Sequence, residues 1–358
     1  MRRVRSTPVI PGLLFTMLMV TACAGTASSP GAGTPSAASS SALPTVAASP
    51  PGSGTGATIE PAVPSLVFTW PGGSTPAVTP ALAGVEAKYV NPGAVIESAG
   101  TLHMFANVFS MWPGEMAIAH LTSTDGVTWT VAKGGPVLTT KDVPFADPGI
   151  DVSTGFIAPG GTWVLLIESV SVIDPWVIGI ATAPGPDGPW TVQREPILRP
   201  GEAGAADAGG VAWPSVVATD DGFAMYYTSY ERPRGAGVIS LATSPDGRTW
   251  TKRPAPVLTP AATWEHGKLD RPRVVRTPAG LLMVYSGALL TDRGAAWSQD
   301  GVAWQRDGDR PVITKAGFPT GTNSWDAALV ARGDAVDYFL EIGSTNGTKV
   351  YRSTAPLP

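Results

Sequence analysis

The chain has 358 residues and a formal net charge of −4 at pH 7, with 24 basic and 28 acidic side chains. No basic stripe runs along it, which argues against a nucleic-acid partner. Its one cysteine excludes an intramolecular disulfide, and its three histidines lack the spacing typical of a transition-metal site. We therefore predict neither a metal nor another cofactor.

Residues 1–22 have the pattern of an export signal, with arginines near the start, a short apolar core and small residues at the end. The ending before Cys23 resembles the lipobox of bacterial lipoproteins, which implies cleavage before Cys23 and a lipid on its sulfur. The chain would then be exported and anchored by this lipid at the surface of the bacterial cell membrane. The alternative is a secretory signal cut elsewhere, with no role for Cys23.

Residues 23–58 consist almost entirely of Ala, Gly, Ser, Thr and Pro after that cysteine. Such a segment has nothing to bury, so we predict a disordered, flexible tether. With a lipid on Cys23, it would hold a folded module away from the membrane. Residues 59–358 are numerous enough to form one large domain with its own core.

A unit of about 60 residues recurs through residues 59–358, and a period of that size marks a repeated supersecondary unit. Each unit contains short β-rich runs joined by Asp-Gly turns, which is typical of an antiparallel meander. We therefore predict an all-β, five-bladed β-propeller with four antiparallel strands per blade. A Trp followed by Pro and an apolar pair marks each unit: Trp70, Trp129, Trp190, Trp250 and Trp304. We predict structural roles for these tryptophans and for the Asp-Gly turns.

The predicted blades begin near residues 90, 147, 211, 269 and 324. The last blade is one strand short, because the chain ends after its third apolar run. The missing outer strand is present in residues 66–79, which carry the first Trp of the repeat. We therefore predict that this N-terminal strand completes blade five and closes the ring. Deletion of residues 60–80 should then unfold the domain.

Strand alternation places the starts of the inner strands and the loops between second and third strands at the same mouth of the axis. Carboxylates, arginines and tryptophans around one concavity suit a sugar, because sugar rings stack on aromatic faces and hydroxyls accept charge-assisted hydrogen bonds. Alignment of the inner strands on their prolines brings these residues to the mouth: Asn91, Asp147, Trp213, Arg271 and Asp326, with Asp151 and Asp270 close behind. The loops add Trp112, Trp176, Glu231, Glu265 and His266.

The five blades, the Asp/Asn-Pro-Gly starts of inner strands and the segment WEHGKLDRPRVV resemble the five-bladed glycoside hydrolases of families 43 and 32 and their relatives, including the mannoside phosphorylases. The similarity extends over residues 60–358. It implies a base or nucleophile, a general acid and an orienting Asp at the axis mouth. On this basis the predicted catalytic residues are Asp147, Asp270, Asp326 and Glu265. The predicted substrate contacts are Asn91, Trp213, Arg271, Glu231, Trp112, Trp176 and His266.

Two positions depart from the pattern of these families. Asn91 stands where blade one carries the first catalytic Asp, and Ala212-Trp213 stand where blade three is expected to carry a carboxyl group. The other acids could form a different constellation, or an Asp at a strand start could simply bond backbone amides. The sequence thus leaves open a cell-surface glycosidase, which we favour, and a non-catalytic propeller that binds a glycan or another ligand. A protein-interaction propeller would instead need large apolar surface patches. A monomer is the default expectation.

Overall fold

The computed structural model describes residues 66–358 except 71–72, 74, 172–174 and 234. The chain divides into two units, Met1–Thr58 and Ile59–Pro358, and all described residues belong to the second. The predicted signal, Cys23 and the tether therefore lie outside the described residues. Within the described part, no helix is long and apolar enough to cross a membrane.

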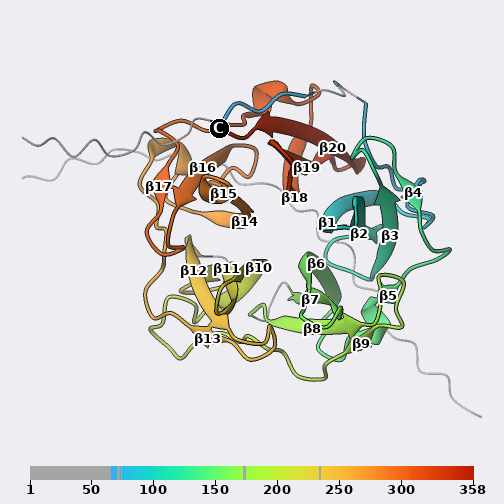
Figure 1. Cartoon of the computed structure of the whole chain (residues 1–358), viewed down its shortest axis with the longest axis horizontal. Coiled ribbons are helices and arrows are strands. Elements are labelled where there is room, and N and C mark those ends of the chain that lie inside the picture. The colour runs from blue at the N-terminus through green and yellow to red at the C-terminus, as the bar shows by residue number, and fades with distance from the viewer. Residues whose placement is uncertain (1–65, 71–72, 74, 172–174, 234) are drawn as a thin grey trace, which may run out of the picture. The chain divides into compact units, whose positions relative to one another are not determined.

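Five antiparallel sheets are arranged around an axis, with one strand of each sheet facing it (Figure 1). Blade one contains β1 (Tyr89–Ser98), β2 (Thr101–Phe109), β3 (Met116–Ser123), β4 (Thr130–Val131) and β5 (Leu138–Thr139); blade two contains β6 (Gly149–Ile157), β7 (Trp163–Val170), β8 (Ile178–Ala183) and β9 (Thr191–Val192). Blade three contains β10 (Gly210–Thr219), β11 (Gly222–Tyr230), β12 (Gly237–Ser244) and β13 (Thr251–Lys252). Blade four contains β14 (Asp270–Thr277), β15 (Gly280–Ser286), β16 (Arg293–Ser298) and β17 (Gln305–Arg306); blade five contains β18 (Asn323–Arg332), β19 (Ala335–Ser344) and β20 (Gly347–Pro356).

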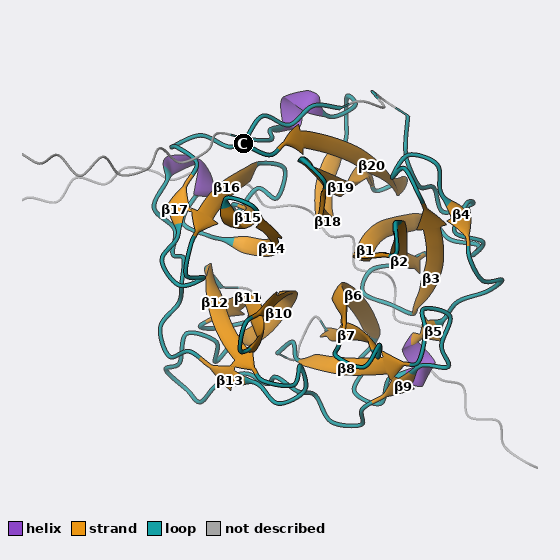
Figure 2. Ribbon diagram, in the orientation of Figure 1, coloured by secondary structure: helices purple, strands orange, loops and turns teal. Residues whose placement is uncertain are grey.

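The predicted all-β, five-bladed propeller is confirmed. Helical structure in the described residues is limited to three 3-10 turns (Figure 2): η1 (Thr140–Asp142), η2 (Thr263–Glu265) and η3 (Lys315–Gly317). Inner strands of successive blades are in contact, and β1 contacts β18, so blades one and five are neighbours as well.

The N-terminal segment pairs with β20, the third strand of blade five. The backbone N–H and C=O of Thr69 bond those of Thr354, at 2.8 and 2.9 Å. Val78 forms a second antiparallel bridge with Val350 and is fully buried. Residues from the two ends of the domain therefore build one blade, as the count of strands predicts.

The hydrophobic core consists of separate layers between adjacent blades. Phe105 of blade one and Ile167 of blade two lie in one such layer, and Leu282 of blade four and Leu340 of blade five lie in another. Because each blade packs against a neighbour on both faces, its central strands are apolar on both faces, and β7 is buried along its whole length. Burial on both faces explains the continuous apolar runs in the sequence.

The repeated tryptophans and Asp-Gly turns build the outer ends of blades one, three and four. The Trp129 indole N–H donates to the carbonyl of Gly126 at 3.2 Å, and the Asp125 carboxylate accepts two backbone N–H bonds in the same turn. The same contacts recur at Trp250 with Gly247 and at Trp304 with Gly301. These residues stabilise turns, as predicted. The rings of Trp129 and Trp304 also pack edge-on against Phe339 and Tyr226 of the neighbouring blades.

Candidate active site at the axis mouth

A cavity of about 370 Å³ opens where the inner strands start. We call it the carboxyl cavity, because three carboxyl-bearing side chains line it: Asp151 on β6, Asp326 on β18 and Glu341 on β19. Six residues that the sequence places at the mouth also line it, namely Asn91, Trp112, Trp176, Trp213, Arg271 and Asp326. Alternation of strand direction in each blade is enough to bring these six together.

Five other predicted site residues do not line this cavity, and one of them, Asp270, lines an adjoining one. Asp147 lies just before β6 and is exposed, and Glu231 and His266 are exposed on their loops. Glu265 is fully buried in η2, where its carboxylate accepts bonds from Arg306 Nε at 2.7 Å and from the backbone of Ala261 at 2.6 Å. These contacts indicate that the Glu265 side chain stabilises the loop around η2. The catalytic assignment of Asp147 and Glu265 stays a prediction that the geometry does not favour.

The proline alignment of the inner strands was wrong for blade two. In blades one, three and four the proline lies within a β-bulge of the inner strand, where its missing N–H costs no ladder bond. In blade two the bulge falls at Ser153, and Pro148 precedes the strand. The residue that reaches the carboxyl cavity from β6 is therefore Asp151, and its cross-strand partner is Glu168.

Asp270 lies beside the carboxyl cavity and lines an adjoining one. It is fully buried and accepts hydrogen bonds from Tyr230 at 3.0 Å and Thr228 at 3.2 Å. Burial is the largest single influence and raises its pKa, but the charges of Arg271 and Lys268 with the hydrogen bonds outweigh it, so the pKa of Asp270 is lowered. A carboxylate held ionised in this way is suited to positioning its neighbours rather than to proton transfer.

The carboxyl groups of the cavity affect one another. Burial, the largest influence, and the Asp326 carboxylate raise the pKa of Glu341 to about 8. Burial and then the charges of Asp326 and Glu168 raise the pKa of Asp151 well above its ordinary value. Burial also raises the pKa of Glu168 to about 7, although Ser153 and the Trp213 N–H donate hydrogen bonds to it. The cluster therefore holds protons near neutral pH, which is a property of acid–base sites.

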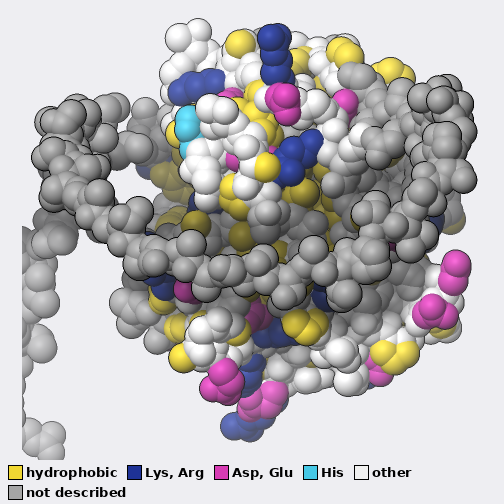
Figure 3. All heavy atoms as spheres, turned by 90° about the vertical axis from the view of Figure 1, so that its left-hand side faces the viewer, with side chains coloured by type: hydrophobic (Ala, Val, Ile, Leu, Met, Phe, Trp, Pro, Cys, Tyr) yellow, Lys and Arg dark blue, Asp and Glu magenta, His cyan; other side chains and the backbone are white. Residues whose placement is uncertain are grey.

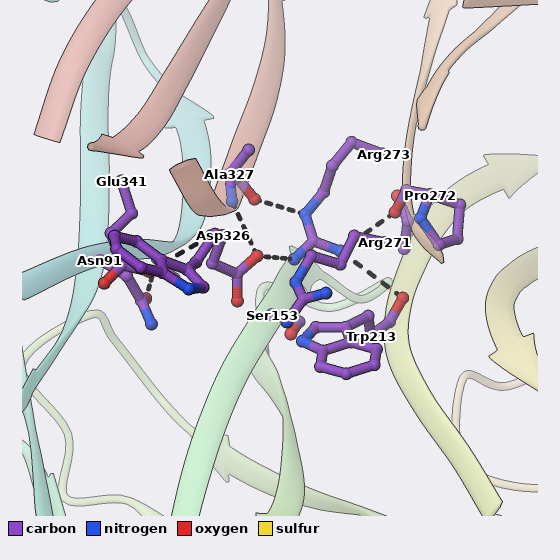
Figure 4. Close-up of polar contacts among 12 residues, drawn as sticks. Asn91, Ser153, Trp213, Arg271, Pro272, Arg273, Asp326, Ala327 and Glu341 are labelled. Carbon is purple, nitrogen blue, oxygen red and sulfur yellow. Dashed lines mark hydrogen bonds and ion pairs between the residues drawn. The ribbon is translucent and has the colours of Figure 1, made fainter. Parts of the chain in front are cut away.

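Asp326 differs from its neighbours because it is ion-paired. Arg273 Nη2 lies 2.6 Å from Asp326 Oδ1, which also accepts the backbone N–H of Ala327 at 2.7 Å. Asp326 Oδ2 is buried without a hydrogen-bond partner. Figure 4 shows Asp326 between Glu341 and Asn91 on one side and the two arginines, Arg271 and Arg273, on the other. The fold thus anchors one carboxylate oxygen and gives the other no hydrogen bond from the described residues.

A row of aromatic rings forms one wall of the cavity. The ring centroids of Trp112 and Trp176 are 6.4 Å apart, and those of Trp176 and Trp213 are 4.7 Å apart. The Arg271 guanidinium covers the Trp213 ring at 3.8 Å (Figure 4). Trp112 is 47% exposed, so its face is open to a ligand.

Asn91 lines the cavity but is already engaged in the fold. Its Oδ1 accepts bonds from Asn107 Nδ2 at 2.6 Å and from the Gly93 N–H at 3.0 Å. Asn107 in turn bonds both backbone groups of Val152 in blade two, at 2.8 and 2.9 Å. This pair of amides links blades one and two where a carboxylate would be expected from the family resemblance.

Sequence reasoning missed Glu168, Glu341 and Arg273. Each lies inside a strand rather than at its start, in the runs TWVLLIESV, DYFLEIG and RPRVV. A charged residue inside an otherwise apolar strand is a usable signal, because a charge is buried only where partners or function require it. In the described part of the chain, no cluster of His, Cys, Asp and Glu could hold a metal ion.

Large exposed apolar side chains are scattered over the described surface. Met111 and Trp112 lie together at the mouth, whereas Val127, Val131 and Val302 are on the outer turns or strands of the blades. On the side of the molecule in Figure 3, the apolar side chains that are visible are interspersed with charged ones. The exposed aromatic surface is therefore found at the mouth.

The sequence matches no protein-family model, and no curated protein resembles it significantly. The fold is similar to a solved glycoside hydrolase, with a TM-score of 0.65 and 16% identity over 81% of this chain and 92% of that chain. It is also similar to a glycoside hydrolase from the family of mannoside phosphorylases that targets β-1,2-mannosidic linkages in Candida mannan, with a TM-score of 0.60 and 17% identity over 84% and 98% of the two chains. A thermostable family-43 glycoside hydrolase matches with a TM-score of 0.57 and 13% identity over 76% and 89%. The likeness establishes a propeller fold shared with glycoside hydrolases.

Proposed function

We propose that the protein is an exported, lipid-anchored, monomeric glycoside-cleaving enzyme that acts on an oligo- or polysaccharide at the axis mouth. The observation that carries this proposal is the shared lining of one cavity: Asp326 and Glu341 line it together with an aromatic wall that includes Trp112. Glycoside cleavage needs one carboxylic acid to protonate the leaving oxygen and one carboxylate to attack carbon or activate water. The fold shared with glycoside hydrolases supports the same class.

Glu341 is the candidate proton donor. Its pKa of about 8 keeps it protonated at neutral pH, and a proton donor works best when its pKa lies near the working pH. Glu341 would give its proton to the glycosidic oxygen as the bond from that oxygen to the anomeric carbon breaks. The backbone N–H of Asp326, at 3.2 Å from Glu341 Oε2, holds the acid beside the second carboxylate.

Asp326 is the candidate base or nucleophile. Its Oδ1 is held by Arg273 and the Ala327 N–H, and Oδ2, which no described residue bonds, would attack the anomeric carbon or take a proton from an attacking water. Asp151 lines the same cavity and would orient a sugar hydroxyl. Among the catalytic residues that the family resemblance implies, Asp147, Asp270 and Glu265 do not line this cavity and have no catalytic role in this proposal.

A panel of chromogenic arabinosides, xylosides, fructosides and mannosides, assayed with and without inorganic phosphate, tests the proposal. We expect turnover of one class, with losses of at least a hundredfold in Asp326→Asn and Glu341→Gln, because general acid–base catalysis contributes about 10²–10⁴-fold. Glu115→Gln is the matched control, since the Glu115 side chain is 75% exposed and lies outside the cavity. Wild-type activity in both cavity variants would remove the two residues from the mechanism.

A non-catalytic glycan-binding propeller is the second candidate. Asn91 favours it, because an amide that links two blades stands where the related enzymes are expected to carry an acid. Saturable binding of a glycan with no turnover of any glycoside in the panel would select this function.

A further inference from the structure

A second cavity of about 190 Å³ adjoins the carboxyl cavity at the boundary between blades three and four. The two share Trp112, Trp176, Trp213 and Arg271 in their linings, so they form one groove with two compartments. The second compartment is additionally lined by Tyr230, Lys268 and Asp270. A ligand that occupied both would extend from the carboxyl groups over the aromatic wall.

The lining of the second compartment carries a net positive charge. Lys268 and Arg271 contribute two positive charges, and Asp270 is the one carboxylate among the described residues that line it. Lys268 Nζ lies 2.8 Å and Arg271 Nη1 lies 3.5 Å from Asp270 Oδ2. A single carboxylate thus positions two cations, and one positive charge is left without an opposite charge in this lining.

Arg271 is held in place at a conformational cost. Its φ is 50°, and Trp213, its stacking partner, has a φ of 48°, both in the left-handed region that favours glycine. Each residue lies in a β-bulge and precedes a proline, in the neighbouring strands β14 and β10. Strained non-glycine residues persist where the surroundings enforce them and often mark ligand sites. The Nε of Arg271 is buried and has no hydrogen-bond partner among the described residues.

Lys268 is placed by the loop that precedes blade four. Its backbone N–H donates to the Glu265 carbonyl at 3.1 Å, and the Glu265 side chain is fixed by Arg306 and Tyr285. The ammonium group lies over the Tyr230 ring at 5.2 Å. The Lys268 side chain is 25% exposed, so a ligand can reach it from the groove.

We infer that this compartment, the cationic subsite (Trp213, Tyr230, Lys268 and Arg271), binds a sugar unit that bears a carboxylate, that is, a uronic acid residue of the glycan. The inference rests on the proposed function, because it names the class of saccharide for the same groove. Lys268 and Arg271 would bind the carboxylate through charge-assisted hydrogen bonds, and the aromatic wall would pack against the ring. A neutral sugar in this place would leave the excess positive charge unpaired.

Binding of glucuronate and galacturonate is compared with binding of glucose and galactose, using the full chain and its intrinsic tryptophan fluorescence. We expect each uronate to bind about tenfold more tightly than its neutral counterpart, which is the effect of one charge-assisted pair. The preference should weaken as salt is raised, because part of the subsite is open to solvent.

Lys268→Gln should remove the preference for the uronates over the hexoses, whereas Lys268→Arg should retain it. Lys133→Gln is the matched control, because Lys133 is exposed on the opposite, turn-bearing face near Asp187 and its loss changes the net charge equally. A preference that survives in Lys268→Gln would overturn the assignment of the subsite.

Three further outcomes separate this inference from the function it rests on. Equal affinity for uronates and hexoses, with turnover of neutral glycosides, would overturn the inference and leave the proposed function intact. Tight binding of inorganic phosphate without a uronate preference would identify a free-phosphate site and overturn the inference as well. Absence of binding to any of the saccharides, with no turnover, would overturn both.

Discussion

Arg273 and Asp326 form a buried ion pair of 2.6 Å between the inner strands of blades four and five. Arg273 also donates to the carbonyl of Trp213 in blade three at 3.5 Å and to that of Ala327 in blade five. Arg273 lines a different cavity, at the opposite end of the axis, whereas Asp326 lines the carboxyl cavity. One guanidinium therefore links three successive blades and separates the site from the far end of the axis.

We expect Arg273→Met to lower the free energy of unfolding by about 3–5 kcal/mol, because it leaves the Asp326 carboxylate buried without its counter-ion. Urea denaturation followed by circular dichroism measures the change. The double variant Arg273→Met, Asp326→Leu should be more stable than the single one, since it also removes the uncompensated charge. A single variant as stable as wild type would show that the pair does not hold the inner strands together.

Closure of the ring by the N-terminal segment predicts that deletion of residues 60–80 abolishes cooperative unfolding. The deletion exposes the edge of β20 and removes the fully buried Val78 from the core layer between blades five and one. Thermal unfolding of this variant is compared with that of a chain lacking residues 1–58, which should melt as a single transition. A sharp transition in both would mean that blade five is stable without its outer strand.

The raised pKa of Glu341 predicts how stability depends on pH. The unfolded chain releases the Glu341 proton near its ordinary pKa of 4.5, whereas the folded protein retains it until about pH 8. The stabilisation of the folded state by this proton is therefore fully present below pH 4.5 and is lost as pH rises towards 8. The free energy of unfolding falls over this range. Between pH 5 and 8, the free energy of unfolding of Glu341→Gln should fall by about 2–4 kcal/mol less than that of the wild type.

Urea titrations at several pH values measure this difference, with the exposed Glu115→Gln variant as a control that keeps the wild-type slope. Some slope should remain in Glu341→Gln, because burial also raises the pKa of Glu168, to about 7. Identical pH dependence in wild type and Glu341→Gln would contradict a proton on Glu341 at neutral pH.

Trp112 offers a test of the aromatic wall that leaves the fold intact. Its side chain is 47% exposed, so Trp112→Ala should change the free energy of unfolding by less than about 0.5–1 kcal/mol. The affinity for a bound saccharide should fall about threefold to tenfold, as expected for the loss of one stacking contact. Calorimetric titration measures the change. Met111→Ala, at the exposed neighbouring residue, should bind as wild type does, and an equal loss in both variants would argue against stacking on Trp112.

Much of the site's outline could be predicted from the sequence, because position along a blade determines which end of the axis a residue reaches. Asn91, Trp213, Arg271 and Asp326 reach the cavity from strand starts, as the repeat predicts. Asp147 does not, because register within blade two depends on where its bulge falls, and that follows from the pairing of β6 with β7. A one-residue change of register moves every side chain of a strand to the other face.

The sequence alone determined the number of blades and the strand that closes the ring, since these depend on periodicity and strand count. It also predicted the end of the axis at which the candidate site residues gather. Only the tertiary structure decided which acids meet. Glu341 and Glu168 lie far from the strand starts in the sequence pattern, and their proton affinities depend on burial and on neighbours from their own and from other blades. Such through-space electrostatic coupling leaves no periodic trace along the chain, so it becomes visible only when the five blades are assembled.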